Sequence, residues 1–146
     1  MITLMTDIEK LRDVALDQYG FVTTAQAEEA GVTRHSLAAL ARRNRLERVA
    51  HGLYRVPQVP ETQYGAFMRA VLWTGAPEAA LSHDTALDAY EVCDINPTKI
   101  HVTVGKDRRI SKSGGEGYVL HRQNVDPDQR AWWHGVPIVT LPCAIE

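Results

Sequence analysis

Arginine residues gather in one short stretch of this chain. Residues 33–56 hold six arginines and one glutamate, a net charge of +5, whereas residues 1–32 carry −4 and residues 57–98 carry −5. The whole chain carries only −2, and its pI of about 6.3 is unremarkable. A cationic stretch between acidic ones is the electrostatic pattern of a surface that neutralises phosphates. The charge pattern therefore predicts that residues 33–56 contact DNA.

The residue types within this stretch suit a helix that lies in a DNA groove. At about 100° per residue, Leu37, Leu40 and Ala41 fall on one side of a helix. The opposite side holds small and basic residues, namely His35, Ser36, Ala39, Arg42 and Arg43. Small side chains allow close approach to the groove, while arginines reach base edges or phosphates. The alternative is an amphipathic helix whose basic face is only solvated.

Two short helices are expected to position this face. Thr23 can cap the first one, with Gln26 at the spacing of a capping box, and Thr33 can cap the second. Gly31 lies between them, where the first helix must end in a residue with positive φ. A glycine-containing turn between two short helices is typical of a helix-turn-helix.

A further helix and a hairpin flank this pair. Residues 7–19 have a helical apolar pattern that includes Leu16, and Asp7 can cap it. Residues 46–49 and 53–56 are β-prone and surround a glycine-containing turn, which indicates a hairpin. Three helices followed by a small hairpin predict a winged helix-turn-helix domain.

The hairpin of a winged helix is placed to touch the DNA backbone. Arg48, His51 and Arg55 are expected to do so, which adds affinity but little sequence discrimination. The alternative is a capping hairpin whose arginines are solvated. The complete set of expected DNA-binding residues is Thr33, Arg34, His35, Ser36, Ala39, Arg42, Arg43, Arg48, His51 and Arg55.

Pro57 to Pro60 forms a stiff connector, and it divides the chain into two expected domains. Residues 1–57 are the winged helix-turn-helix, and residues 58–146 are a mixed α/β domain, so the fold class is α+β. The second domain is expected to have helices over residues 62–74 and 83–90 and strands over residues 100–104, 118–121 and 136–140. A mobile surface loop is expected between the first two strands, with the cations Lys106, Arg108, Arg109 and Lys112.

Ser82, His83 and Asp84 are the three residue types of a hydrolytic triad. Members of such a triad converge from separate segments, and consecutive residues cannot adopt that geometry. A simpler interpretation makes Ser82 the N-cap of a helix with Asp84 in its first turn.

Other site patterns are missing from the sequence. The histidines His83, His101, His121 and His134 and the cysteines Cys93 and Cys143 lack the spacing of a zinc site. There is no nuclease set of carboxylates, no phosphate-binding loop and no dinucleotide fingerprint. The protein is therefore expected to be no enzyme, and to bind no metal and no cofactor.

The sequence also bears on the cellular compartment and on the ends of the chain. No apolar run reaches the roughly 20 residues that cross a bilayer, and the N-terminus lacks the features of a secretory signal. No membrane partner and a cytoplasmic location are therefore expected. A last helix opens at Thr140-Leu141-Pro142 and the sequence stops at Glu146, which predicts that the second domain is truncated.

The order of several segments resembles the AbiEi family of antitoxins from type IV toxin–antitoxin systems. The segments are FVTTAQAEEAGVTRHSLAALARRNRLERV, GLYRV, ALSHDTALDAYEV, IHVTV and GVPIVTLPCAIE. The resemblance implies a winged helix that represses its own operon and a second domain that counters a nucleotidyltransferase-like toxin. It implies double-stranded DNA, the protein's own operator, as a partner. Direct binding of the toxin and homodimerisation are left open.

Two other classes of function compete with this interpretation. One is a nucleic-acid-processing or toxin-modifying enzyme that uses the histidine-containing second domain. The other is a protein-interaction module in which the helix-turn-helix only packs.

Overall fold

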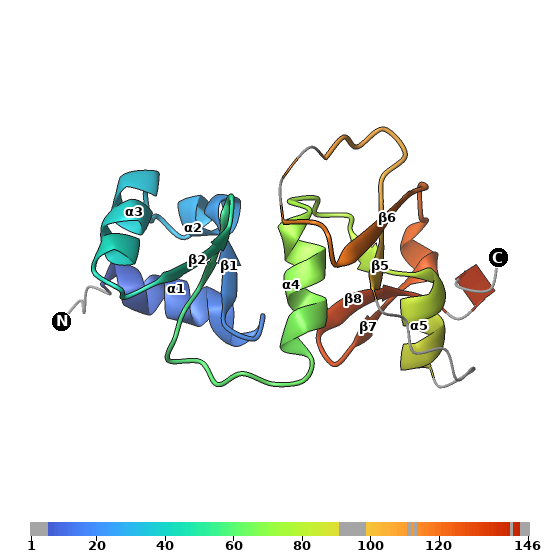
Figure 1. Ribbon diagram of the computed structural model, residues 1–146, viewed down its shortest axis with the longest axis horizontal. Helices are drawn as coiled ribbons and strands as arrows, with labels where there is room; N and C mark the ends of the chain where they lie inside the picture. Colours follow the sequence, from blue (N-terminus) through green and yellow to red (C-terminus); the bar gives the residue numbers. More distant parts are fainter. Residues whose placement is uncertain (1–5, 91–98, 111, 113, 141, 144–146) are drawn as a thin grey trace. The chain divides into compact units, whose positions relative to one another are not determined.

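The protein forms two compact units, residues 1–65 and residues 66–146. The computed structural model describes residues 6–90, 99–110, 112, 114–140 and 142–143 (Figure 1). Cys93 and Leu141 lie outside the described residues, and so does most of the last helix that the sequence predicts. Sequence analysis placed the domain boundary at residue 57. The structure has it eight residues later because Val59 is only 7% exposed and lies in the core of the first unit.

The first unit combines three helices with a three-stranded antiparallel sheet. The helices are α1 (Asp7–Leu16), α2 (Thr24–Glu29) and α3 (Arg34–Arg42). The strands β1 (Phe21–Thr23), β2 (Glu47–Ala50) and β3 (Leu53–Arg55) have the order β1-β3-β2. Sequence analysis did not predict β1, because three residues are too few to show alternation. Its pairing makes β3 the central strand.

The starts of α2 and α3 agree with the predicted caps. The Thr23 hydroxyl accepts a hydrogen bond from the Gln26 amide at 3.1 Å, and the Gln26 side chain accepts from the Thr23 amide at 3.0 Å. The Thr33 hydroxyl accepts from the Ser36 amide at 3.1 Å. Gly31 has a φ of 89°, which permits the tight turn between the two helices.

The boundaries of α1 differ from those predicted. Thr6, and not Asp7, is its N-cap, in a capping box with Glu9. The helix ends at Leu16, before Tyr19, since Tyr19 and Gly20 have φ values of 57° and 93° and turn the chain into β1. Leu16 is 55% exposed and therefore does not belong to the apolar stripe.

One apolar cluster holds the first unit together. Leu40 and Tyr54 pack at its edge and are partly buried. Its buried members come from α1, β1, α2 and α3 and from the segments before α3, before β2 and after β3: Leu11, Ala15, Val22, Ala27, Val32, Leu37, Leu46, Val56 and Val59. Because α3 contributes Leu37 to this cluster, its opposite side must face away from it.

The second unit is a five-stranded mixed sheet with the order β6-β5-β4-β8-β7. Its helices are α4 (Gly65–Trp73) and α5 (His83–Ala89), and a short 3-10 helix, η1, spans Pro127–Gln129. The strands are β4 (Ala80–Leu81), β5 (Ile100–Val104), β6 (Tyr118–Arg122), β7 (Arg130–Trp133) and β8 (Val136–Val139). Mixed α/β structure is confirmed, and β4 and β7 were not predicted.

The two helices of this unit cover opposite faces of the sheet (Figure 1). On one face, Trp73 of α4 packs against Tyr118 of β6 with ring centroids 5.2 Å apart. On the other face lie His101 and Thr103 of β5, which alternate with buried Val102 and Val104. The start of α5 lies against this second face.

The described part of the β5–β6 loop is anchored, although the sequence predicted a mobile surface loop. The Lys112 ammonium donates to the Trp73 carbonyl at 2.9 Å, at the C-terminal end of α4. Gly115 lies so close to the Trp73 ring that a Cβ there would be 2.7 Å from its Cη2 atom. Arg108 adds an ion pair to Glu78. None of the described helices is long and apolar enough to cross a membrane.

Truncation of Leu37 tests the packing of α3. Leu37 is 1% exposed, so Leu37→Ala is expected to lower the free energy of unfolding by about 2–5 kcal/mol. Leu16→Ala is the matched control, because the same atoms are lost from a side chain that is 55% exposed. Thermal and urea unfolding measure both changes. Equal effects of the two substitutions would contradict the assigned orientation of α3.

Candidate functional site

The outward side of α3 carries exposed residues at helical spacing. His35, Ala38 and Arg42 are exposed, and Ala39 beside them is half-buried. The sequence analysis overlooked Ala38, although helical phase could have found it: at 100° per residue it lies within 40° of Arg42. The face therefore consists of two short side chains with a histidine before them and arginines after them.

The first turn of α3 is held by its own side chains. Besides capping the Ser36 amide, the Thr33 hydroxyl lies 3.1 Å from the Ser36 hydroxyl oxygen. Arg34 forms an ion pair with Glu28 of α2 at 2.9 Å, with both side chains largely exposed. Such a pair contributes at most about 1 kcal/mol in water. Arg34 thus connects α2 and α3 across the turn, and its charge is partly compensated.

The end of α3 gathers unpaired positive charge. Arg42 lies in the last turn, where a cation favourably meets the helix dipole, and Arg43 is the C-cap residue. Asn44 has a φ of 58° and ends the helix, and the next residue, Arg45, is exposed. Arg45 was not among the expected site residues. Its position between α3 and β2 places a third exposed guanidinium near the other two along the chain.

The β2–β3 hairpin presents two of its three predicted residues. Arg48 and His51 are exposed, and the Arg48 guanidinium lies 3.5 Å from the His51 Nδ1 atom. Gly52 has a φ of 74° in the turn, and the pairing shifts between Arg48 and Ala50. The hairpin tip is therefore polar, basic and accessible.

Arg55 departs from the expectation. It is 7% exposed, and its guanidinium donates to the Val59 carbonyl at 2.6 Å. Because β3 is the central strand, Arg55 is flanked on both sides by paired strands, a position that the sequence pattern could not reveal. Arg55 is a structural residue that ties β3 to the segment after it, and we remove it from the candidate contacts.

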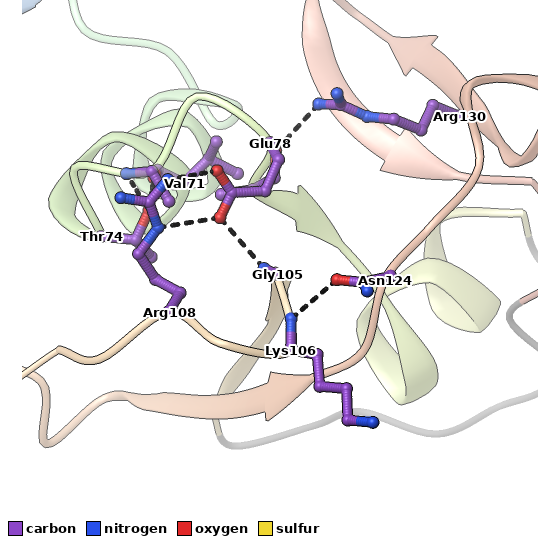
Figure 2. A network of polar contacts seen from close by, with 10 residues as sticks. Val71, Thr74, Glu78, Gly105, Lys106, Arg108, Asn124 and Arg130 are labelled. Atoms are coloured by element: carbon purple, nitrogen blue, oxygen red, sulfur yellow. Dashed lines mark hydrogen bonds and ion pairs between the residues drawn. The ribbon is translucent and has the colours of Figure 1, made fainter.

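Arg108 of the β5–β6 loop belongs to a separate polar network in the second unit (Figure 2). Arg108 donates to both carboxylate oxygens of Glu78 at 3.0 and 2.6 Å, and the Gly105 amide donates to Glu78 at 3.0 Å. The hydrogen bond from Arg108 lowers the pKa of Glu78 to about 2, so this carboxylate is ionised at all ordinary pH values. The Arg108 guanidinium is therefore held by Glu78.

An open polar pocket of about 660 Å³ lies beside this ion pair. Its lining residues are Glu78, Gly105, Asp107, Arg108, Arg109 and Asn124. The Lys106 amide donates to the Asn124 side chain at 2.9 Å, as Figure 2 shows, while the Lys106 and Arg109 side chains are exposed. Its lining contains both acidic and basic side chains, which gives it no strong preference for an anion.

Ser82 and His83 are in contact, although the sequence analysis expected consecutive residues not to adopt the geometry of a triad. The Ser82 hydroxyl lies 2.9 Å from the His83 Nδ1 atom, although the two residues are consecutive. Ser82 is the N-cap residue of α5, but its hydroxyl makes no capping bond and receives a hydrogen bond from Thr103 at 2.7 Å. Since Ser82 is only 2% exposed, its oxygen is not accessible to a substrate. Among the described residues, no set of three His, Cys, Asp or Glu side chains could hold a metal ion.

Comparison with known proteins bears on the first unit. Residues 9–57 match the family model described as a transcriptional regulator, AbiEi antitoxin. This AbiEi-matching segment contains α2, α3, the hairpin and every candidate contact, and it confirms the family resemblance predicted from the sequence. A search of the curated proteins finds no match.

A solved structure resembles the whole chain in fold. The crystal structure of RV2827C protein from Mycobacterium tuberculosis matches with a TM-score of 0.55 and 16% sequence identity. The match covers 98% of this chain and 60% of that one, so the chain spans about 60% of the length of the solved protein. At this identity the likeness concerns the fold alone. It extends beyond the AbiEi-matching segment into the second unit.

Two single substitutions to methionine, one at Arg55 and one at Arg48, distinguish a structural arginine from a surface arginine. Arg55→Met is expected to lower the free energy of unfolding by about 1–3 kcal/mol, because the buried Val59 carbonyl loses a charge-assisted donor. Arg48→Met removes the same charge from an exposed position and should leave the melting temperature unchanged. Circular dichroism melts compare the two variants. An unchanged melting temperature of the Arg55→Met protein would show that Arg55 has no structural role and would make it a candidate DNA contact again.

Proposed function

We propose that the first unit is a winged helix-turn-helix that binds double-stranded DNA and represses the operon of its own gene. The observation that carries this proposal is the exposed basic face of α3 inside the AbiEi-matching segment. The order of α1, α2 and α3, followed by the β2–β3 hairpin, supports it. In this proposal α3 lies in the major groove and the hairpin follows the backbone.

The side chains of α3 suit the two tasks of such a helix. Ala38 and Ala39 are short and allow the helix axis to approach the groove floor, while His35 and Arg42 flank them and reach further. Arginine pairs with guanine through two hydrogen bonds, and the methyl group of alanine can contact that of thymine. Arg43, Arg45, Arg48 and His51 are proposed to contact phosphates, which positions the helix.

The antitoxin role belongs to the same proposal. The description of the matching family as an antitoxin supports it, and we assign to the second unit the task of countering a nucleotidyltransferase-like toxin. The proposal includes a location in the cytoplasm, where the operator is found. It makes no commitment on direct toxin binding or on homodimerisation.

Paired substitutions in α3 test the DNA-binding proposal. Arg42→Ala with Arg43→Ala should weaken binding to the DNA upstream of the gene by at least tenfold, because each arginine–guanine pair contributes roughly 1–3 kcal/mol of discrimination. Arg12→Ala on α1 with Lys99→Ala in the second unit removes the same charge from exposed positions outside the candidate contacts and should have little effect. Mobility-shift titrations measure both variants. Equal losses would indicate that only net charge matters.

A salt series tests which unit carries the phosphate contacts. Val59 is in the core of the first unit, so the fragment must extend to residue 65 to keep the fold. Each neutralised phosphate makes log K fall with log salt by about 0.9. Residues 1–65 should therefore show nearly the slope of the whole chain, since Arg42, Arg43, Arg45 and Arg48 remain.

Two other results have distinct meanings in this experiment. A clearly shallower slope for the fragment would show that exposed cations such as Lys106 and Arg109 also contact the backbone. The full chain with Lys106→Ala and Arg109→Ala should then reproduce that slope. Absence of DNA binding by the full chain would leave the protein-interaction module as the better interpretation.

A further inference from the structure

Three histidine rings meet on the face of the second sheet that α5 covers. His83 is the first residue of α5, His101 lies in β5 and His121 lies in β6. The His83 and His121 rings stack with centroids 3.6 Å apart and planes inclined by 14°. The His101 Nδ1 and His121 Nε2 atoms are 2.9 Å apart. We call these three residues the histidine cluster, and all three are partly buried.

The hydrogen bonds of the cluster limit the number of protons that its rings can hold. The His101–His121 contact can hold one proton between its two nitrogens, and a second proton would place two donors face to face. The Thr103 hydroxyl donates to the Ser82 hydroxyl oxygen at 2.7 Å. The Ser82 proton is then available for the His83 Nδ1 atom, 2.9 Å away, provided that this nitrogen is unprotonated.

Protonation of His83 at Nδ1 turns this nitrogen from an acceptor into a donor, so one hydroxyl proton of the Ser82–Thr103 pair loses its acceptor. Ser82 and Thr103 are 2% and 3% exposed, so water cannot replace the lost partner. A buried polar group that loses its hydrogen bond destabilises the fold. The two hydrogen bonds that link Thr103, Ser82 and His83 therefore couple the charge of the His83 ring to Ser82, the buried residue that follows β4.

The backbone of His83 stores strain at the same place. Its φ is 50°, in the left-handed region that residues with a side chain rarely adopt. The stacked ring and the bond to Ser82 oppose relaxation of this conformation. If the ring becomes charged and separates from His121, the first turn of α5 is free to relax.

Charges around the cluster act in a consistent direction. Burial lowers the pKa of His83 below its usual 6.5, and nearby His101 lowers it further. Burial also lowers the pKa of His121, with His83 and His101 adding to the effect. The Asp84 carboxylate acts on both rings and opposes these shifts without reversing them.

We propose that the histidine cluster is an acid-sensitive latch, which holds the start of α5 on β5 and β6 when neutral and releases it when protonated. The latch is a property of the second unit and does not depend on DNA binding by the first. A metal ion is a poorer occupant of this place, since the His83 and His121 rings stack face to face and no three His, Cys, Asp or Glu side chains of the described residues could hold one.

The sign of the pH dependence follows from the lowered pKa values. A histidine in the unfolded chain takes up a proton near pH 6.5, whereas His83 and His121 in the folded chain resist it. The unfolded state then binds more protons, so stability is complete above pH 6.5 and falls as the pH drops below it. Each proton taken up on unfolding raises the unfolding constant by up to about tenfold per pH unit.

Thermal unfolding of the full chain between pH 7.5 and 5.5 tests the latch. The wild-type protein should lose stability over this range, with a drop of about 5 °C or more in the Tm of the second unit. His83→Asn with His121→Gln should flatten the dependence. Asparagine accepts left-handed φ values and keeps an acceptor for Ser82, and neither new side chain titrates.

His134→Asn is the matched control. His134 also has a φ of 50°, but it lies in the β7–β8 turn away from the cluster, so its replacement should keep the wild-type pH slope. An unchanged slope in the His83→Asn/His121→Gln protein, or no pH dependence in the wild type, would overturn the proposal.

A titration of the wild-type protein decides the matter if the double variant does not fold. The imidazole Cε1 protons of all six histidines can be followed by NMR as the pH falls. Two of them should titrate below 6.5, and the amide signals of α5 should shift or broaden in the same range. Titration of every histidine at or above 6.5 would refute the latch.

Discussion

Burial of apolar side chains from several segments around Leu37 fixes the position of α3. Leu11 of α1, Val32 before α3 and Val59 after β3 pack with it in one cluster. A helix of nine residues is marginal alone in water, so this packing, more than intrinsic propensity, keeps α3 formed. The orientation of the basic face follows directly, because burying Leu37 turns His35, Ala38 and Arg42 outward.

Polar contacts then decide which cations remain available. Arg55 is buried against the Val59 carbonyl, Arg108 is held by Glu78 and Arg34 is paired with Glu28. A count of arginines in residues 33–56 therefore overstates the charge that a DNA molecule would meet. The available cations concentrate at the end of α3 and on the hairpin, which narrows the surface to be tested.

The second unit uses its titratable residues differently. Its loop cations anchor the chain to α4 and Glu78, and its histidines pack on each other beneath α5. A low pKa at Glu78 and lowered pKa values at His83 and His121 arise from opposite causes, a charged partner in one case and burial in the other. The unit's pH response near neutrality is expected to come from His83 and His121.

The sequence alone determined what depends on local chemistry. The caps at Thr23 and Thr33, the turn at Gly31, the phase of α3 and the family resemblance follow from short-range spacing. The tertiary structure decided what depends on strand order and on contacts between distant segments. The central position of β3 buries Arg55, and the alignment of β5 with β6 brings His101 beside His121, which lies 20 residues further along the chain. The alternation of side chains along a strand predicts which face of the sheet a residue lies on, but it does not predict which strand lies beside it.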